Sequence, residues 1–188
     1  MTEPDQFMID HALRVAAGSP CRSKRGVVLY DMQTGAFRGA GYNGPPRDAP
    51  CPGRAVCAGI CGQRSVHAET RALRAGEVYR TLGHPPGPYD LIHVELAADG
   101  GVVACDGPSC WQCAREVLDV GFVGGVWLYL GVSRCLACRR FEDSSDKSAD
   151  RWRRCPECGT DMTPQGAWRR YTAEELYRVT LERCGMVP

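Results

Sequence analysis

Hydrophobic and polar positions follow two distinct periods along the first two thirds of the chain. Between residues 4 and 17 the apolar side chains, among them Met8, Ala12 and Leu13, recur at helical spacing, and Gly18 ends the pattern. Short apolar runs bounded by glycine and proline then predict strands. The elements expected further along are strands at 26–30, 36–42, 89–96 and 122–130, and helices at 66–76, 110–120 and 172–184. Strands and helices that alternate after an initial hairpin predict an α/β fold, a three-layer α/β/α sandwich around a mixed sheet.

Composition narrows the classes of protein that fit this pattern. The chain has 188 residues, 44% of them hydrophobic, which suits one domain with a substantial core. A formal net charge of +1 argues against a strongly electrostatic binder of polyanions. The 12 cysteines fall in C-x-x-C pairs and a loop cluster, and no apolar run approaches membrane-spanning length. Since the N-terminus has no signal-peptide pattern, we expect metal-binding thiols in a reducing cytoplasm and no membrane partner.

Two short motifs carry the candidate chemistry, His67-Ala68-Glu69 and Cys110-x-x-Cys113. Each enters a predicted helix, and cysteines three positions apart share one helix face. One imidazole and two thiolates leave a tetrahedral zinc ion an open position for water, whose pKa the zinc lowers to about 7. Glu69 is better placed as a proton shuttle than as a ligand. The alternative is a purely structural zinc site, with a nearby fourth ligand such as Cys105.

These motifs resemble the cytidine deaminase superfamily, and most of all its deoxycytidylate deaminase branch. The resemblance covers about residues 5–130 and rests on the segments 21–26, 41–45 (Gly-Tyr-Asn-Gly-Pro), 66–69 and 110–113. It implies a cytidine deaminase-like sandwich and a zinc-dependent hydrolase that converts a deoxycytidine monophosphate-like nucleotide to its uracil product and ammonia. The resemblance implies zinc-bound hydroxide as the nucleophile and Glu69 as the catalytic proton shuttle.

The resemblance also implies substrate contacts. Asn43 is expected to bind the sugar or the base, the adjoining loop at Gly44 to lie near the phosphate, and the backbone of Ala68 to read the pyrimidine edge. Relatives carry proline directly before the first zinc cysteine, whereas this chain has Ser109 there. The carbonyl that accepts the amino group of the base therefore belongs to a shifted turn at Ser109. From local sequence alone, Asn43 also fits a left-handed turn residue before Gly44.

The later cysteines predict further zinc. Cys135-x-x-Cys138 and Cys155-x-x-Cys158 have the spacing of a four-cysteine zinc ribbon, and the polar segment between the pairs needs a metal to order it. The ribbon occupies the place where relatives continue to a fifth strand, so that strand is expected at about 165–171 or is absent. We expect a catalytic domain at 1–131, the ribbon as an insertion at 132–160, and a C-terminal strand and helix at 161–188 packed on the catalytic domain.

Four earlier cysteines form a second candidate cluster. Some deoxycytidylate deaminases bind an extra zinc with cysteines that correspond to Cys21 and Cys51, and Cys57 and Cys61 would complete a four-thiolate site here. Such a site would pin the Pro/Gly-rich loop beside the substrate pocket. The alternative is a set of ordinary small buried side chains.

Some residues of metal-binding type belong to no motif. Cys105 and Cys184 are expected as buried thiols, and His11, His84 and His93 receive no role.

Three interpretations of function remain open at this point. The first is a nucleotide deaminase. The second is a deaminase of cytosine or adenine in single-stranded DNA or RNA, with the ribbon as a nucleic-acid grip, although its nearly cancelling charges favour a solvated surface. The third is an inactive zinc-binding module, against which the intact Glu69 speaks. Relatives often form homo-oligomers, and the sequence shows no interface.

Overall fold

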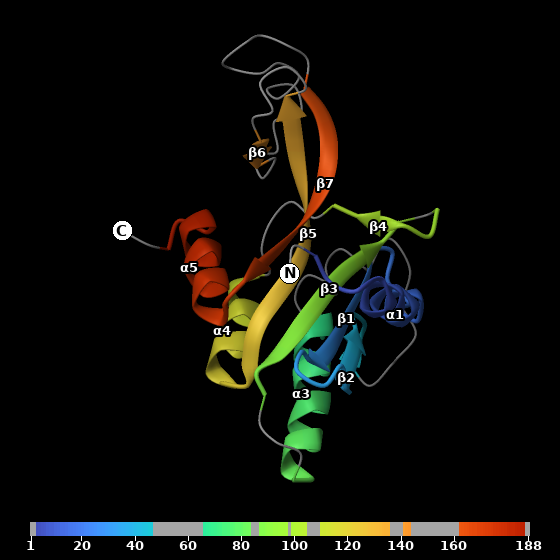
Figure 1. Cartoon of the computed structure of the whole chain (residues 1–188), viewed down its shortest axis with the longest axis vertical. Coiled ribbons are helices and arrows are strands. Elements are labelled where there is room, and N and C mark those ends of the chain that lie inside the picture. Colours follow the sequence, from blue (N-terminus) through green and yellow to red (C-terminus); the bar gives the residue numbers. More distant parts are fainter. Residues whose placement is uncertain are drawn as a thin grey trace.

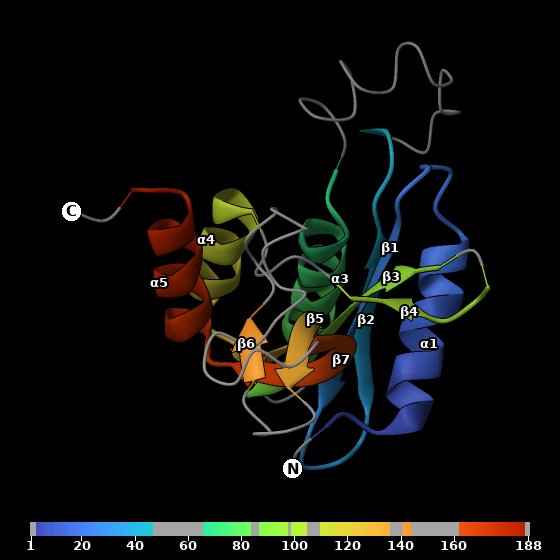
Figure 2. The same ribbon diagram turned by 90° about the horizontal axis from the view of Figure 1, so that it is seen from above.

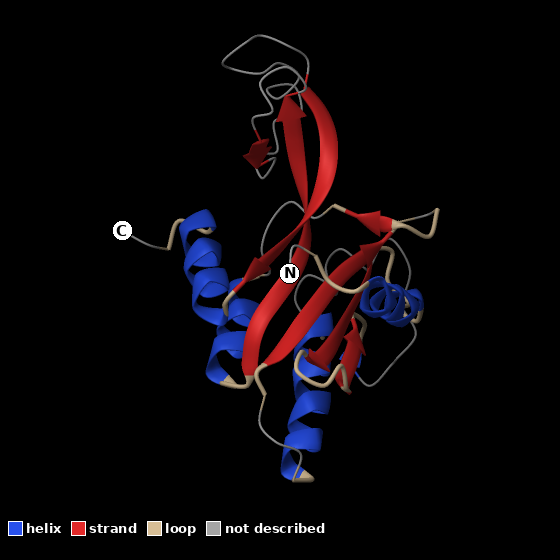
Figure 3. Ribbon diagram, in the orientation of Figure 1, coloured by secondary structure: helices blue, strands red, loops and turns tan. Residues whose placement is uncertain are grey.

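One mixed sheet of seven strands organises the molecule (Figures 1 and 3). The computed structural model describes residues 3–46, 66–83, 87–97, 99–104, 110–135, 141–143 and 162–186. In chain order the strands are β1 (Lys24–Asp31), β2 (Phe37–Tyr42), β3 (Tyr89–Leu96), β4 (Val102–Val103), β5 (Val123–Cys135), β6 (Phe141–Asp143) and β7 (Met162–Tyr171).

The strand order is β2-β1-β3-β5-β6, with β4 paired to β3 and β7 paired to β5. β1 runs antiparallel to both β2 and β3, whereas β5 runs parallel to β3 and antiparallel to β7. The expected initial hairpin and mixed sheet are therefore confirmed.

Helices cover both faces of the sheet, as the view along its edge shows (Figure 2). The helices of the described residues are α1 (Gln6–Ala17), α3 (Ala68–Thr81), α4 (Trp111–Asp119) and α5 (Ala173–Arg183). Alternating side chains of β3 separate two cores, because Ile92 packs on the α1 side whereas Leu91 packs on the side of α3, α4 and α5. This arrangement confirms the three-layer α/β/α sandwich. Within the described residues, no helix combines the length and the apolar character that a membrane span needs.

The C-terminal strand lies where a displaced strand was expected. β7 pairs with β5 over ten positions, from Val126 opposite Tyr171 to Cys135 opposite Met162. The two strands rise together beyond the rest of the sheet (Figure 1). β5 therefore continues past residue 131, where we expected the catalytic domain to end.

An ion pair between Arg170 and the buried Asp90 carboxylate connects β7 to the centre of the sheet. Asp90 on β3 is 2% exposed and accepts two hydrogen bonds from the Arg170 guanidinium of β7, each 2.8 Å long. Trp127 of the intervening β5 donates to the same carboxylate at 2.8 Å. A side chain at Gly125 would meet the guanidinium at 2.4 Å, so the glycine leaves the space through which Arg170 reaches Asp90. The pair thus spans three strands.

β2 approaches the first turns of α3 closely at Gly41. A Cβ atom at Gly41 would lie 2.5 Å from the carbonyl oxygen of Ala68 and 2.6 Å from the amide nitrogen of Ala72. Real Cβ atoms do not approach backbone this closely, so only glycine lets the first turns of α3 rest on the strand. The Gly41–Gly44 motif therefore also has a packing reason for its first residue.

We predict that Arg170→Met destabilises the fold by about 1–3 kcal/mol, because it removes the charged partner of a buried carboxylate. The matched control is Arg178→Met, since Arg178 makes an exposed ion pair with Glu182 at 2.7 Å. An exposed pair of this kind contributes about 0.3–0.5 kcal/mol. Urea unfolding of both variants measures the difference, and equal losses would contradict the role assigned to the Asp90 pair.

Candidate metal centre and active site

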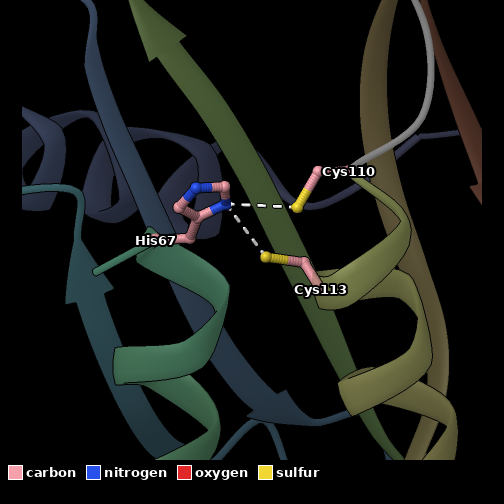
Figure 4. Close-up of side chains that lie close together, drawn as sticks. All are labelled: His67, Cys110 and Cys113. Carbon is pink, nitrogen blue, oxygen red and sulfur yellow. Dashed lines mark hydrogen bonds between the residues drawn. The ribbon is translucent and has the colours of Figure 1, made fainter. Parts of the chain in front are cut away.

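The candidate site forms where α3 and α4 begin. His67 is the N-cap residue of α3 and Cys110 is the N-cap residue of α4, each with extended backbone and neither with a side-chain capping bond. Their side chains are therefore directed away from their own helix ends and toward each other (Figure 4). Cys113 follows in the first turn of α4 and is 2% exposed. The sequence spacing thus places one imidazole and two sulfurs at a single point.

Three metal-ligand atoms converge there. His67 Nδ1 lies 3.1 Å from Cys113 Sγ and 3.3 Å from Cys110 Sγ. The ligand atoms of all three residues lie within 4.8 Å of one another. A tetrahedral zinc ion would hold a nitrogen and a sulfur ligand about 3.6 Å apart, so the observed donors need to separate only slightly to accept it. Among the described residues these three could hold a zinc ion.

The electrostatics of the three groups call for a cation. The hydrogen bond from the Cys113 thiol, helped by His67, lowers the pKa of Cys110 to about 4. The same bond and burial raise the pKa of Cys113. The Cys110 hydrogen bond in turn raises the pKa of His67. Two thiols this close cannot both ionise unless a positive ion compensates them, and a bound zinc ion would supply that charge and displace the protons.

Glu69 lies beside the three ligands and outside their cluster. It occupies the first turn of α3, it is 4% exposed, and it is not among the donor atoms within 4.8 Å of one another. The Cys110 hydrogen bond is the largest cause that raises the pKa values of His67 and Cys113. The charge of Glu69 adds to it at both residues, whereas burial lowers the pKa of His67 and raises that of Cys113. A buried carboxylate at this place is suited to hold and move a proton.

A hydrogen bond between the two helices fixes their relative position. Thr70 Oγ1, one residue after Glu69, donates to Glu116 Oε2 at 2.5 Å. Glu116 lies three positions after Cys113, on the same side of α4. The bond therefore holds the imidazole-bearing end of α3 against the thiol-bearing end of α4. Sequence analysis missed this pair, although its spacing from the two motifs was visible.

The Asn43 segment lies next to the start of α3. Gly44 and Val66 exchange two backbone hydrogen bonds, of 2.9 and 3.1 Å, which bring the end of β2 beside His67. Arg71 of α3 adds a hydrogen bond of 2.8 Å to the carbonyl of Pro45. Two segments that were separate motifs in the sequence are therefore neighbours in the fold.

The side chain of Asn43 is engaged with the segment before β1. Its Oδ1 accepts from the backbone amide of Arg25 at 2.8 Å and lies 2.9 Å from Ser19 Oγ. Its Nδ2 donates to the carbonyl of Ser23 at 2.8 Å. Asn43 thus orders residues 19–25, which include the buried Cys21.

Of the remaining predicted site residues, two lie in described elements. Ala68 opens α3 and is buried, and Cys135 ends β5 opposite Met162. The others lie outside the described residues: Cys51, Cys57, Cys61, Cys105, Ser109, Cys138, Cys155 and Cys158. The expectation that Cys184 is a buried thiol is wrong, because this residue is exposed where α5 ends and the chain leaves the packed layer.

One buried histidine was given no role by sequence analysis. His93 on β3 is 8% exposed, and its Nδ1 lies 3.5 Å from Glu69 Oε1. The available signal was its position in the alternation of β3, since residues 89 and 91 point into the core beneath α3 and α4. A histidine two positions further on belongs to the same face.

Comparisons with known proteins give likenesses to solved structures only. No family model matches the chain, and no curated protein does. The dCMP deaminase of cyanophage S-TIM5 is 16% identical in apo form over 65% of this chain and 82% of that chain, with a TM-score of 0.41. Its complex with dCMP and dUMP matches at 16% identity over 66% and 82%, with a TM-score of 0.42. A cytidine deaminase from Burkholderia pseudomallei is 17% identical over 76% and 94%, with a TM-score of 0.44. At TM-scores this low the likenesses carry no argument, so the chemistry of the site rests on its own residues.

Proposed function

We propose that this chain is a zinc-dependent hydrolytic deaminase of the cytidine deaminase superfamily, acting on a deoxycytidine monophosphate-like nucleotide. One observation carries the proposal: His67, Cys110 and Cys113 converge at two helix N-termini with the buried Glu69 beside them. Three protein ligands leave a fourth position open, which is typical of catalytic zinc and not of closed structural sites. The cluster contains no fourth ligand among the described residues.

The residues of the site divide the chemistry between them. His67, Cys110 and Cys113 would hold the zinc ion, which when bound supplies Lewis acidity that makes water nucleophilic near neutral pH. Glu69 takes one proton from the attacking water and passes it to the ring nitrogen beside the attacked carbon. It then moves the remaining proton of the added hydroxyl to the amino group, so that the C–N bond breaks, ammonia leaves and the carbonyl forms. The two helix N-termini add positive potential, which favours the thiolates.

The motif around Asn43 supports a nucleotide substrate. Its segment is fastened beside His67 by the Gly44–Val66 bonds, so a sugar bound there would lie next to the metal ligands. Arg25 adjoins this segment, because its backbone amide donates to Asn43. Its side chain is half exposed and forms an ion pair with Glu95 at 3.2 Å. The near-neutral charge of the chain favours a free nucleotide over a polynucleotide.

The structure supports the ribbon proposal through the backbone alone. Cys135 ends β5 opposite Met162 at the far end of the β5–β7 pair. Cys138 lies three positions after Cys135, and Cys158 lies four positions before Met162. Both C-x-x-C pairs are therefore close in sequence to the same end of the β5–β7 pair, which is compatible with a four-thiolate zinc site.

An ammonia-release assay tests the substrate. With zinc-loaded protein we expect turnover of dCMP above that of deoxycytidine and of AMP, because the phosphate and the pyrimidine edge both contribute to binding. Single-stranded oligonucleotides containing cytosine or adenine serve as the comparison. Preference for the oligonucleotides would favour the polynucleotide deaminase, and no release from any of them would favour the inactive zinc-binding module.

Glu69→Ala separates proton transfer from metal binding. We expect zinc content to stay at the wild-type level and kcat to fall by at least about 10²–10⁴-fold, because only the proton shuttle is removed. Glu77→Ala is the matched control on the same helix, since Glu77 makes only an exposed pair with Arg80. Normal turnover by Glu69→Ala would contradict the mechanism.

Elemental analysis tests the number of zinc ions. We expect about three ions per chain, from the catalytic site, the ribbon and the Cys21 cluster. Cys113→Ser is expected to remove one ion together with activity, Cys135→Ser a different one, and Cys184→Ser, an exposed free thiol, none. Two ions in the wild type would reject one accessory site, and one ion would reject both.

A further inference from the structure

We propose that His93 is a positioning residue that fixes the Glu69 carboxylate by donating a hydrogen bond from Nδ1 to Oε1; this inference rests on the proposed function. The two atoms lie 3.5 Å apart, and the side chains of His93 and Glu69 are 9% and 6% exposed. His93 Nδ1 is buried and has no other hydrogen-bond partner among the described residues. Glu69 Oε1 therefore lies in front of the His93 Nδ1 donor. Leaving a buried donor without an acceptor costs free energy, so this contact is favoured.

The fold holds His93 rigidly beneath the site. β3 is a central strand, and His93 lies opposite Val27 of β1 on one side and Leu128 of β5 on the other. Backbone hydrogen bonds on both sides fix its Cα, whereas the Glu69 carboxylate stands at the end of a longer side chain in the first turn of α3. A carboxylate that must move protons between several atoms gains from a partner anchored in the sheet.

The protonation state of the ring suits this role. Burial lowers the pKa of His93, opposed in part by the charge of Glu69, so the imidazole is neutral near pH 7. A neutral ring with its proton on Nδ1 orients the carboxylate without the full charge of a cation. An arginine or lysine in the same place would lower the pKa of Glu69 and weaken it as a base.

The distance is long for a hydrogen bond, and that is consistent with a catalytic contact. Hydrogen bonds within active sites commonly tighten when the substrate binds. When the Glu69 carboxylate moves between the attacking water and the ring of the substrate, it would keep its hydrogen bond to the His93 imidazole. The expected contribution is that of other partners that orient site residues, about 10–100-fold in activity.

Three variants measured on dCMP test the proposal. His93→Leu is expected to lower kcat by about 10–100-fold, with KM nearly unchanged and zinc content equal to wild type. His93→Asn is expected to restore most of that loss, because the Asn Nδ2 amide occupies the place of Nδ1. His11→Leu is the matched control, since His11 contacts Tyr30 in the α1 layer and not the site. Wild-type kcat in His93→Leu, or no rescue in His93→Asn with zinc and melting temperature intact, would overturn the positioning role.

A spectroscopic measurement keeps this inference separate from the proposed function. In zinc-loaded protein with ¹⁵N-labelled histidine, His93 is expected as the Nδ1–H tautomer, assigned by the loss of its signals in His93→Asn. Glu69→Ala is expected to shift the Nδ1 signal. The Nε2–H tautomer, or an Nδ1 signal unmoved by Glu69→Ala, would refute the contact even in a protein that releases no ammonia. Absence of turnover in the wild type with the Nδ1–H tautomer and the shift present would instead reject the deaminase and keep the contact.

Discussion

The N-termini of α3 and α4 meet at one partly buried point, and this meeting constrains how the elements around the site pack. Two sulfurs and an imidazole meet there, partly shielded from solvent; their mutual hydrogen bonds lower the pKa of Cys110 and raise those of Cys113 and His67. A divalent cation would accept both thiolates and leave the imidazole neutral. The same convergence places Glu69 next to the ligands without making it one.

The surrounding fold keeps the two helix ends in register. Gly41 lets α3 lie directly on β2, and the Thr70–Glu116 bond holds α3 against α4. Asn43 adds a second constraint, because its side chain orders residues 19–25 while its neighbour Gly44 bonds to Val66. The observed contacts of Asn43, which was expected at the substrate, are therefore structural.

The extended part of the β5–β7 pair is anchored to the sheet by a charged contact at its base. β5 and β7 extend as a pair beyond the helices (Figure 1). The Asp90–Arg170 pair anchors the base of this extension to β3. Cys135, the first cysteine of the predicted ribbon, ends β5 at the far end of this extension.

Sequence patterns alone were enough to predict most of the elements and the candidate metal ligands. Periodicity predicted the hairpin, the central strand at 89–96 and the four helices of the described residues, because apolar spacing reflects which faces are buried. His67 and the Cys110–Cys113 pair were predicted to form one cluster because the two motifs together match a known zinc-ligand pattern. Only the tertiary structure decided which distant residues touch that cluster. His93 is 24 positions from Glu69 along the chain and belongs to no motif, and Asp90 and Arg170 are 80 positions apart. Strand order and register set such contacts, and neither is written in local sequence.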